Sequence, residues 1–342
     1  MKKYISLFLA LLMVLSLFTA CSANDAKEPA KNEGTTASDE ERTGGSESAD
    51  DEDFLVGLTL MFYDDPYFLD MRNTVKDYCD EHGWGFTEFD AASDAANQCD
   101  AIENMIASGI DALVLAAVDS SAVIPVIEKC NKQGIPVFCV DAGVDGGEIV
   151  TLCESDNYEA GVLCGEALVE KIGGSGQICI TNSPSGAAAR LREEGFRSVI
   201  EQHPEIEVMD TQESVNQTRG MEIGDTWAIA YPELAAVFSI DDNSGLGVAS
   251  AFANAGLFVP IYSVDGSSTA AEQIKDPNMM YAGTAAQQPI LIAMNAMEAV
   301  NAWKNGEKDT IDPHIQVPVF MVNEENAQAY LDGELTQYEV AR

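Results

Sequence analysis

Positive charge is scarce in this 342-residue sequence, which has 18 lysines and arginines but 57 aspartates and glutamates. The formal net charge is −39 at pH 7. A field of this sign repels nucleic acid and anionic lipid surfaces, whose binding proteins depend on lysine and arginine. We therefore expect no nucleic-acid partner and no electrostatic attraction to a membrane surface.

Motifs for catalysis and for cofactor or metal binding are also absent from the sequence. The three histidines, His82, His203 and His314, stand singly, with no HxxxH spacing. No CxxC pair, no Gly-x-Ser-x-Gly elbow and no Gly-Lys-Ser/Thr phosphate loop occurs. The sequence therefore predicts a protein with no cofactor, no metal site and no catalytic residues. An α/β enzyme is the alternative, and turnover of a candidate ligand would revive it.

A long apolar run occurs only near the N-terminus. Two lysines precede the stretch Tyr4 to Phe18, which is short for a membrane-spanning helix and is followed by small residues and Cys21. We predict that residues 1–20 are a signal peptide and that the protein is extracytoplasmic. The run Phe18-Thr19-Ala20-Cys21 resembles the lipobox of bacterial lipoproteins, which implies a diacylglycerol anchor on Cys21. An ordinary secretory signal with an incidental cysteine is the alternative.

Residues 22–53 contain almost no large apolar side chain, and 11 of them are acidic against 3 that are basic. Such a segment cannot bury enough surface to offset chain entropy, so we expect it to be disordered. We assign residues 21–53 to the lipidated cysteine and a disordered acidic tether. The remainder, residues 54–342, has 46 acidic and 13 basic side chains, a balance that favours solubility and does not specify a fold.

Seven cysteines follow Cys21, at positions 79, 99, 130, 139, 153, 164 and 179. Their number is odd, and most fall on apolar faces of predicted helices and strands. There a free cysteine behaves as a small hydrophobic residue. Zinc or redox chemistry is therefore not expected, whereas the spacing leaves open whether any two form a disulfide.

Short apolar runs alternate with amphipathic stretches from Phe54 onward, which is typical of repeated β-α units. The predicted strands lie at 54–61, 85–89, 112–117, 136–140, 177–181, 207–211, 236–240 and 260–264. The predicted helices lie at 66–82, 94–108, 121–133, 157–172, 187–202, 219–230, 244–255, 269–275 and 289–305. Units of this length imply parallel sheets with helices on both faces. The chain beyond the tether exceeds the usual size of a single core, so we expect two such lobes.

Polar residues collect where the predicted strands end, which is where open parallel sheets bind their ligands. The clusters are Tyr63 to Phe68, Asp141 to Gly143, Asn182 to Gly186 with Arg190, Asp241 to Asn243, Asp265-Gly266, and Gln287 to Pro289. Carboxylates accept hydrogen bonds from paired hydroxyls, arginine donates several, and glutamine does both. Aromatic rings can cover the apolar face of a sugar. The clusters therefore predict a site for a small polyhydroxylated ligand.

Each of these residues also has an ordinary structural interpretation. Asp65 before a proline suits a helix N-cap, and Asp242 and Asn243 suit caps as well, which leaves Asp241 as the better ligand candidate. Arg190 can pair with a glutamate one helical turn later. Tyr67 and the phenylalanine after it suit a hydrophobic core. The ligand-site interpretation depends on all six clusters falling at the same edge of the predicted sheets.

Several segments together resemble the periplasmic binding protein type I family, in its ribose- and galactose-binding branch. They are Tyr63 to Phe68, Gly109 to Leu113, Gly134 to Val137, Ser155 to Asn157, Ala188 to Arg190, Asp241-Asp242, Val264 to Gly266, and Gln287. The resemblance spans residues 54 to about 331. It implies that the ligand is contacted from the first lobe by Asp65, Tyr67, Phe68 and Asp141. From the second lobe and the hinge it implies contacts by Arg190, Asp241, Asp265 and Gln287.

The same resemblance implies two doubly wound, Rossmann-like parallel-sheet lobes, joined by a multi-strand hinge with the ligand cleft between them. We predict an N-terminal lobe of residues 54–155 plus 287–315 and a C-terminal lobe of residues 156–286 plus 316–342. The implied function is that of a monomeric, lipid-anchored receptor that binds a sugar and delivers it to an ABC permease. A ligand sensor for a signalling kinase or chemoreceptor is the alternative, and neighbouring genes would discriminate between the two.

The sequence departs from that branch at several positions. Ala142 stands where ribose-binding relatives have arginine, and Asp241 stands where relatives commonly have asparagine. Val215 and Asn216 occupy the region of an aromatic residue that stacks on the sugar, so this face is left to Trp227 or to no residue. The additional carboxylate leaves room for an amino sugar or another cationic ligand.

Overall fold

The structure is a computed structural model, and it describes residues 54–276 and 279–335. The predicted signal peptide, the lipidation site at Cys21 and the acidic tether lie outside the described residues. Within the described ranges, no helix has both the length and the apolar character needed to cross a membrane.

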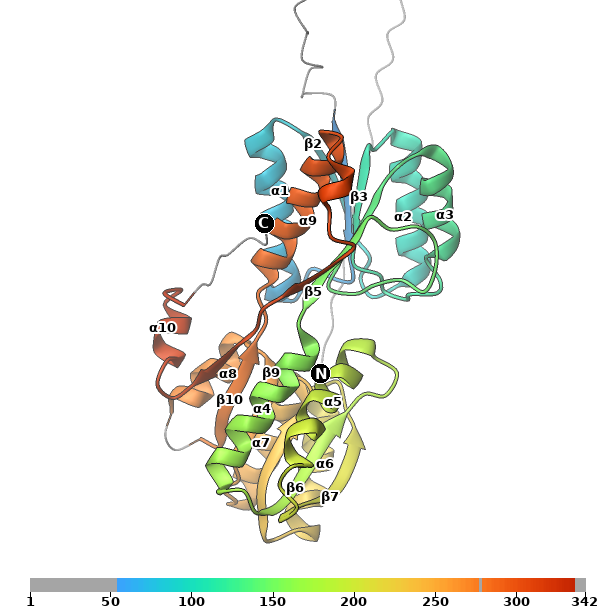
Figure 1. Cartoon of the computed structure of the whole chain (residues 1–342). Helices are drawn as coiled ribbons and strands as arrows, with labels where there is room; N and C mark the ends of the chain where they lie inside the picture. The colour runs from blue at the N-terminus through green and yellow to red at the C-terminus, as the bar shows by residue number, and fades with distance from the viewer. Residues whose placement is uncertain (1–53, 277–278, 336–342) are drawn as a thin grey trace, which may run out of the picture. The chain divides into compact units, whose positions relative to one another are not determined.

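The first sheet has six parallel strands in the order β11-β5-β4-β3-β1-β2. Figure 1 shows this lobe with helices on both sides of the sheet. They are β1 (Leu55–Leu60), β2 (Gly85–Asp90), β3 (Ala112–Leu115), β4 (Val137–Val140), β5 (Thr151–Ser155) and β11 (His314–Val317). One face packs against α1 (Pro66–His82) and α9 (Pro289–Lys304). The other face packs against α2 (Ala95–Ser108) and α3 (Ile124–Gln133). This lobe therefore has three layers, with an apolar core on each side of the sheet.

The second sheet has the order β12-β10-β9-β8-β6-β7, and its edge strand β12 is antiparallel to β10. The strands are β6 (Gly176–Asn182), β7 (Ile206–Glu213), β8 (Leu234–Ser239), β9 (Ile261–Asp265), β10 (Tyr281–Ala286) and β12 (Phe320–Asn323). One face packs against α4 (Asn157–Ile172) and α5 (Ala187–Ile200). The other packs against α6 (Gln217–Ala230), α7 (Asp242–Ala255), α8 (Ser268–Lys275) and the short α10 (Ala327–Leu331). The predicted class of two α/β lobes built on parallel sheets is confirmed.

The chain passes between the two sheets three times: after Ser155, between β10 and α9, and between β11 and β12. A 3-10 turn, Lys308–Thr310, lies between α9 and β11. The predicted lobe boundary between residues 315 and 316 falls inside β11, which belongs to the first sheet throughout; the lobe boundaries predicted from the sequence are retained as a proposal. Three connections restrict twisting and sliding of the lobes more than bending, the arrangement of a hinge.

Aspartates and glycines set several helix limits. Asp65 caps α1 by accepting a hydrogen bond from the Tyr67 amide at 2.8 Å, and the helix ends at Gly83 in the left-handed conformation. At α7 the cap is Asp241, which accepts from the Ser244 amide. The prediction that Asp242 and Asn243 act as caps is therefore wrong, because the helix already includes both residues.

All seven cysteines after Cys21 are free in the structure. Six are buried and Cys99 is half-buried. Burial raises the pKa of Cys139 to about 12, and it raises the thiol pKa of the other six as well. The thiols therefore stay protonated and pack as small apolar groups, as the sequence predicts.

Helices α4 and α5 approach so closely that only glycine fits at their crossing. A Cβ atom on Gly195 would lie 2.0 Å from the Tyr158 carbonyl oxygen, and one on Gly161 would lie 2.0 Å from the Arg192 carbonyl oxygen. We expect Gly195→Ala to lower the free energy of unfolding by about 2–3 kcal/mol, because the helices must separate. Urea denaturation measures this loss. Gly186→Ala, where the new Cβ meets neighbours at 3.5 Å or more, should cost less than about 1 kcal/mol. Equal losses for both would contradict the steric argument.

Candidate functional site

A cavity of about 1310 Å³ lies at the carboxyl ends of both sheets. Its walls come from the segments that follow β1 and β4 in the first lobe and from those that follow β6, β8, β9 and β10 in the second lobe. All eight candidate residues line it: Asp65, Tyr67, Phe68, Asp141, Arg190, Asp241, Asp265 and Gln287. The two sheets thus direct their polar strand ends into one space, as parallel topology requires.

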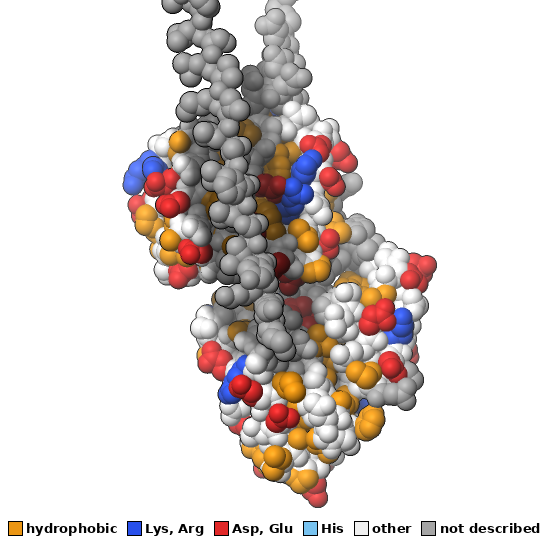
Figure 2. Space-filling model, turned by 180° about the vertical axis from the view of Figure 1, so that it is seen from behind, with side chains coloured by type: hydrophobic (Ala, Val, Ile, Leu, Met, Phe, Trp, Pro, Cys, Tyr) orange, Lys and Arg blue, Asp and Glu red, His pale blue; other side chains and the backbone are white. Residues whose placement is uncertain are grey.

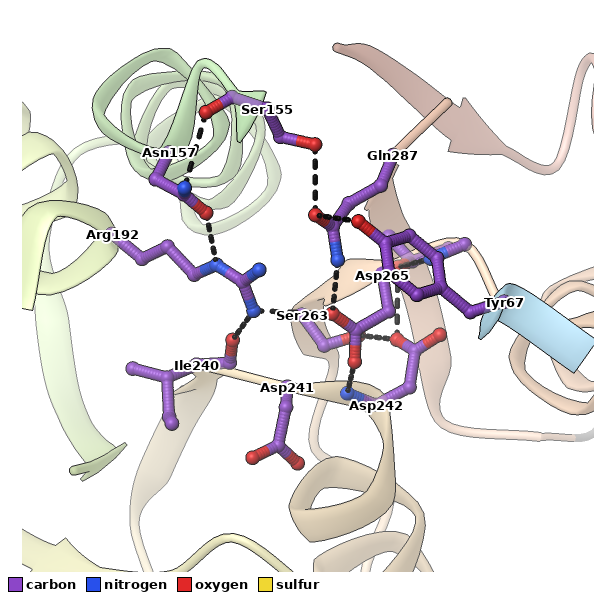
Figure 3. A network of polar contacts seen from close by, with 12 residues as sticks. Tyr67, Ser155, Asn157, Arg192, Ile240, Asp241, Asp242, Ser263, Asp265 and Gln287 are labelled. Atoms are coloured by element: carbon purple, nitrogen blue, oxygen red, sulfur yellow. Dashed lines mark hydrogen bonds and ion pairs between the residues drawn. The ribbon is translucent and has the colours of Figure 1, made fainter. Parts of the chain in front are cut away.

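Gln287, directly after β10, lines the cavity and joins the two lobes by hydrogen bonds (Figure 3). Its Oε1 accepts hydrogen bonds from Ser155 Oγ at 2.8 Å and from Tyr67 Oη at 3.2 Å. Its Nε2 donates to Asp265 Oδ1 at 2.9 Å. Tyr67 Oη also donates to Asp141 Oδ1 at 2.8 Å. One glutamine therefore connects side chains of the first lobe with a carboxylate of the second.

Arg192, which the sequence analysis did not select, is the buried cation of the site. Its Nε donates to Asn157 Oδ1 at 2.8 Å, and its Nη1 donates to the Ile240 carbonyl at 2.9 Å and to Asp265 Oδ1 at 3.1 Å. The residue is only 8% exposed and lines the cavity. It therefore supplies the positive charge beside the half-buried Asp265 carboxylate.

Arg190 differs from Arg192 in its exposure to solvent. It lines the cavity but is exposed, and its Nη1 donates to the Pro184 carbonyl at 2.8 Å. The sequence did hold a signal that separates the two arginines. Ala189 and Phe196 are buried on α5, and Arg192 lies three residues after one and four before the other, on the same helix face.

Three aspartates of the second lobe have raised pKa values. Burial is the main cause for Asp241, Asp242 and Asp265; Arg192 lowers the pKa of Asp265, and Asp242 raises it. Asp242 Oδ1 accepts from Thr284 Oγ1 at 2.8 Å and from Ser263 Oγ, so it is a structural anchor. The Asp241 carboxylate lies apart from the Arg192 network (Figure 3).

In the first lobe, Asp141 has its carboxylate in the cavity and its backbone at φ 63°, in the left-handed region. Burial raises the pKa of this carboxyl group. Tyr67 and Phe68 pack edge to face, with ring centroids 5.2 Å apart, and both line the cavity. Phe68 also belongs to the core, being 6% exposed. The first lobe therefore offers a hydrogen-bonding carboxylate beside an aromatic wall.

Trp227 does not provide the stacking face that the sequence left open to it. Its side chain is fully buried, and its indole nitrogen donates to Asp210 Oδ2 at 2.9 Å. Val215 lines the cavity in this region instead.

Over residues 54–276 and 279–335, no cluster of three or more histidine, cysteine or acidic side chains suits a metal ion.

The raised carboxyl pKa values predict how stability depends on pH. An acid whose pKa is higher in the folded state stabilises the fold below its unfolded pKa, about 4, and this contribution is lost as pH rises through the folded value. We expect the ligand-free protein to have a higher melting temperature at pH 5 than at pH 8. In Asp241→Asn this difference should shrink, because the titrating group is gone. Thermal denaturation at both pH values measures it, and an unchanged difference in the variant would contradict this account.

The fold and cavity define a two-lobed α/β binding protein with its site between the lobes. Residues 56–308 match the model of the periplasmic binding protein domain family, and the chain belongs to this family. A ribose import binding protein from Bacillus subtilis (strain 168) is 29% identical over 309 residues, covering 90% of this chain and 95% of that protein. A xylitol-binding protein from Mycolicibacterium smegmatis is 24% identical, and the match covers 86% of this chain and 87% of that protein.

Solved structures have the same fold. An arabinose-transporter binding protein from Shewanella sp. ANA-3, bound to L-arabinofuranose, has a TM-score of 0.73 and 26% identity, over 82% of this chain and 95% of that one. An ABC transporter solute-binding protein from Bacillus halodurans C-125, with bound myo-inositol, has a TM-score of 0.74 and 22% identity, over 83% and 99%. The predicted family membership is therefore confirmed.

Proposed function

We propose that this protein is the solute-binding component of an ABC importer, taking up a sugar or polyol outside the cytoplasm. The observation that carries the proposal is the single cavity into which both lobes direct their polar strand ends, connected through Gln287. Relatives named for ribose import and for xylitol binding support this class of ligand. The lipid anchor on Cys21, a monomeric state and a permease partner belong to the same proposal.

Binding would exchange hydrogen bonds within the cavity for hydrogen bonds to ligand hydroxyls. Tyr67 and Asp141, which both line the cavity, bond to each other, and both can turn toward a ligand. Asp265, held by Arg192 and Gln287, offers acceptor capacity from the second lobe. A ligand that bridges the two carboxylates stabilises the closed arrangement of the lobes, and hinge closure would then mark the receptor as loaded for the permease.

The charge of the cavity restricts the ligand further. Eight acidic residues line it, and the basic residues among its lining are two arginines, Arg190 and Arg192. One of these arginines is paired with Asp265, so negative charge remains in excess. Acidic side chains also outnumber basic ones on the surface face in Figure 2. We therefore propose neutral sugars, polyols and amino sugars as ligands, and we exclude sugar phosphates and uronic acids, which this field repels.

Thermal unfolding with a panel of pentoses, hexoses, inositols, amino sugars and sugar phosphates tests the proposal. A ligand at one hundred times its dissociation constant stabilises the folded state by about 2.7 kcal/mol, a readily measured shift. We expect a shift with one class of neutral or amino-substituted sugar and none with sugar phosphates. No shift with any sugar or polyol would contradict the proposed function, and a shift with a sugar phosphate would contradict the charge argument.

A further inference from the structure

The C-terminal segment places two side chains in the wall of the cavity. Tyr330 and Leu331, at the end of the short helix α10, both line it. Helix α10 packs against α8 and the edge strand β12. These residues lie beyond residues 56–308, the part of the chain that the family model matches.

Tyr330 closes the turn after β9. Its Oη donates to the Gly266 carbonyl oxygen at 2.5 Å, while the Gly266 amide donates to Thr284 Oγ1 at 3.1 Å. Gly266 has φ +79°, and a Cβ on it would lie 2.5 Å from Ala286 Cβ and 2.8 Å from the tyrosine hydroxyl. The turn is thus enclosed by Ala286 and Thr284 of β10 and by the Tyr330 hydroxyl group, which bonds to the Gly266 carbonyl.

The neighbouring residue in this turn is Asp265, which has φ 132°, a backbone conformation that residues with a side chain rarely adopt. Its carboxylate accepts hydrogen bonds from Arg192, from Gln287 and from the Asp242 amide at 3.1 Å. A strained backbone persists only where surrounding contacts hold it. The position of this carboxylate in the cavity therefore depends on the contacts of the Gly266 turn.

Tyr330 is well placed to be such a contact. Its ring packs edge to face on Phe320 of β12, with centroids 5.8 Å apart. Burial raises the pKa of the phenol to about 12, so the hydroxyl keeps its proton at neutral pH and remains a hydrogen-bond donor. Phe320 therefore fixes the ring, and the hydroxyl group is directed at the Gly266 carbonyl.

We infer that Tyr330 is a positioning residue of the binding site. Its hydroxyl fixes the turn that presents the Asp265 carboxylate to the ligand, and its ring, with Leu331, limits the space for ligand on the α8 side. The effect on ligand binding rests on the proposed function. The role of Tyr330 in fixing the Gly266 turn depends on the structure alone.

The test compares Tyr330→Phe with Tyr231→Phe in the full chain. Tyr231 also has its hydroxyl directed at a backbone carbonyl of the second lobe, Met209 O at 3.4 Å, but it does not line the cavity. Amide hydrogen exchange without ligand reports on the turn. We expect exchange at residues 265–268 to become about fivefold faster in Tyr330→Phe, the loss expected for one hydrogen bond, and to be unchanged in Tyr231→Phe. Equal exchange in both variants would overturn the inference.

The ligand arm uses calorimetric titration with D-ribose, D-allose, L-arabinose and myo-inositol. We expect Tyr330→Phe to weaken the binding of whichever probe the native protein binds by about fivefold or more, and Tyr231→Phe to leave it unchanged. Leu331→Ala should improve the binding of larger sugars relative to that of smaller ones, because it widens the cavity at this wall. Native affinity in Tyr330→Phe would overturn the positioning role. If no probe bound the native protein while the turn loosened in the variant, the proposed function would fail and the turn-fixing role would stand.

Discussion

Arg192→Ala is expected to lower the free energy of unfolding by about 2–4 kcal/mol, because it leaves the half-buried Asp265 carboxylate without its cation and two further acceptors without their donor. The guanidinium makes three hydrogen bonds, to Asn157, to the Ile240 carbonyl and to Asp265, and the residue is 8% exposed. Its removal leaves the Asn157 amide oxygen and the Ile240 carbonyl without this donor and Asp265 without its ion pair. Urea denaturation at pH 8 measures the loss, and ligand binding should vanish with it.

Arg190→Ala is the matched control, on the same helix and two residues away. Its side chain is exposed and bonds to one carbonyl, that of Pro184. We expect a change in stability within about 0.5 kcal/mol and a loss of ligand affinity alone. If the two variants lost equal stability, the assignment of Arg192 as the buried cation would be wrong. Native ligand affinity in Arg190→Ala would remove Arg190 from the proposed binding residues.

Asp141→Asn is expected to weaken ligand binding by about 100-fold while leaving the ligand-free protein as stable as before. A charge-assisted pair of hydrogen bonds to ligand hydroxyls is worth about 3 kcal/mol, and the amide replaces it with weaker neutral bonds. Stability should be retained because burial already disfavours the ionised carboxylate, raising its pKa. Asparagine also tolerates the left-handed backbone at this position.

The measurements for this variant are calorimetric titration with the sugar identified by the panel and urea denaturation without ligand. Asp80→Asn is a suitable control, since Asp80 is exposed on α1, pairs with Lys76 and does not line the cavity. It should leave both quantities unchanged. Tight sugar binding by Asp141→Asn would show that this carboxylate does not contact the ligand.

Local patterns predicted most of the helices closely. The limits of α1 and α4 agree with the sequence prediction, because each begins after a capping aspartate, Asp65 or Asp156, and ends before a left-handed glycine. The strands β5, β10, β11 and β12 were not predicted. Three of them have mixed or polar sequences of four or five residues that carry little periodic signal. β12 is antiparallel to β10 because the chain returns from the first lobe and enters the second sheet at the end where β10 leaves it, with Phe320 opposite Ala286, which no hydrophobic pattern records.

The candidate site was predictable to the extent that topology alone determines it. Residues that follow parallel strands meet at one sheet edge whatever their detailed contacts, so all eight candidates reached the cavity. Arg192 and Tyr330 were missed for different reasons. Arg192 could be recognised only by noting that it lies on the same face of α5 as the buried Ala189 and Phe196. Tyr330 lies beyond every strand-end cluster and reaches the cavity wall because α10 packs against α8 and β12.

The sequence by itself determined the charge, the absence of catalytic and metal motifs, the alternation of strands and helices, and the limits of helices such as α1 and α4. These depend on interactions between residues close together in the chain, whose geometry is known in advance. The tertiary structure alone decided which polar groups pair: Tyr67 with Gln287, 220 residues apart, and Arg192 with Asp265, 73 residues apart. It also decided which glycines lie at a helix crossing. Such pairings depend on the register of packed elements, because a shift of one residue on a helix turns a buried side chain toward solvent.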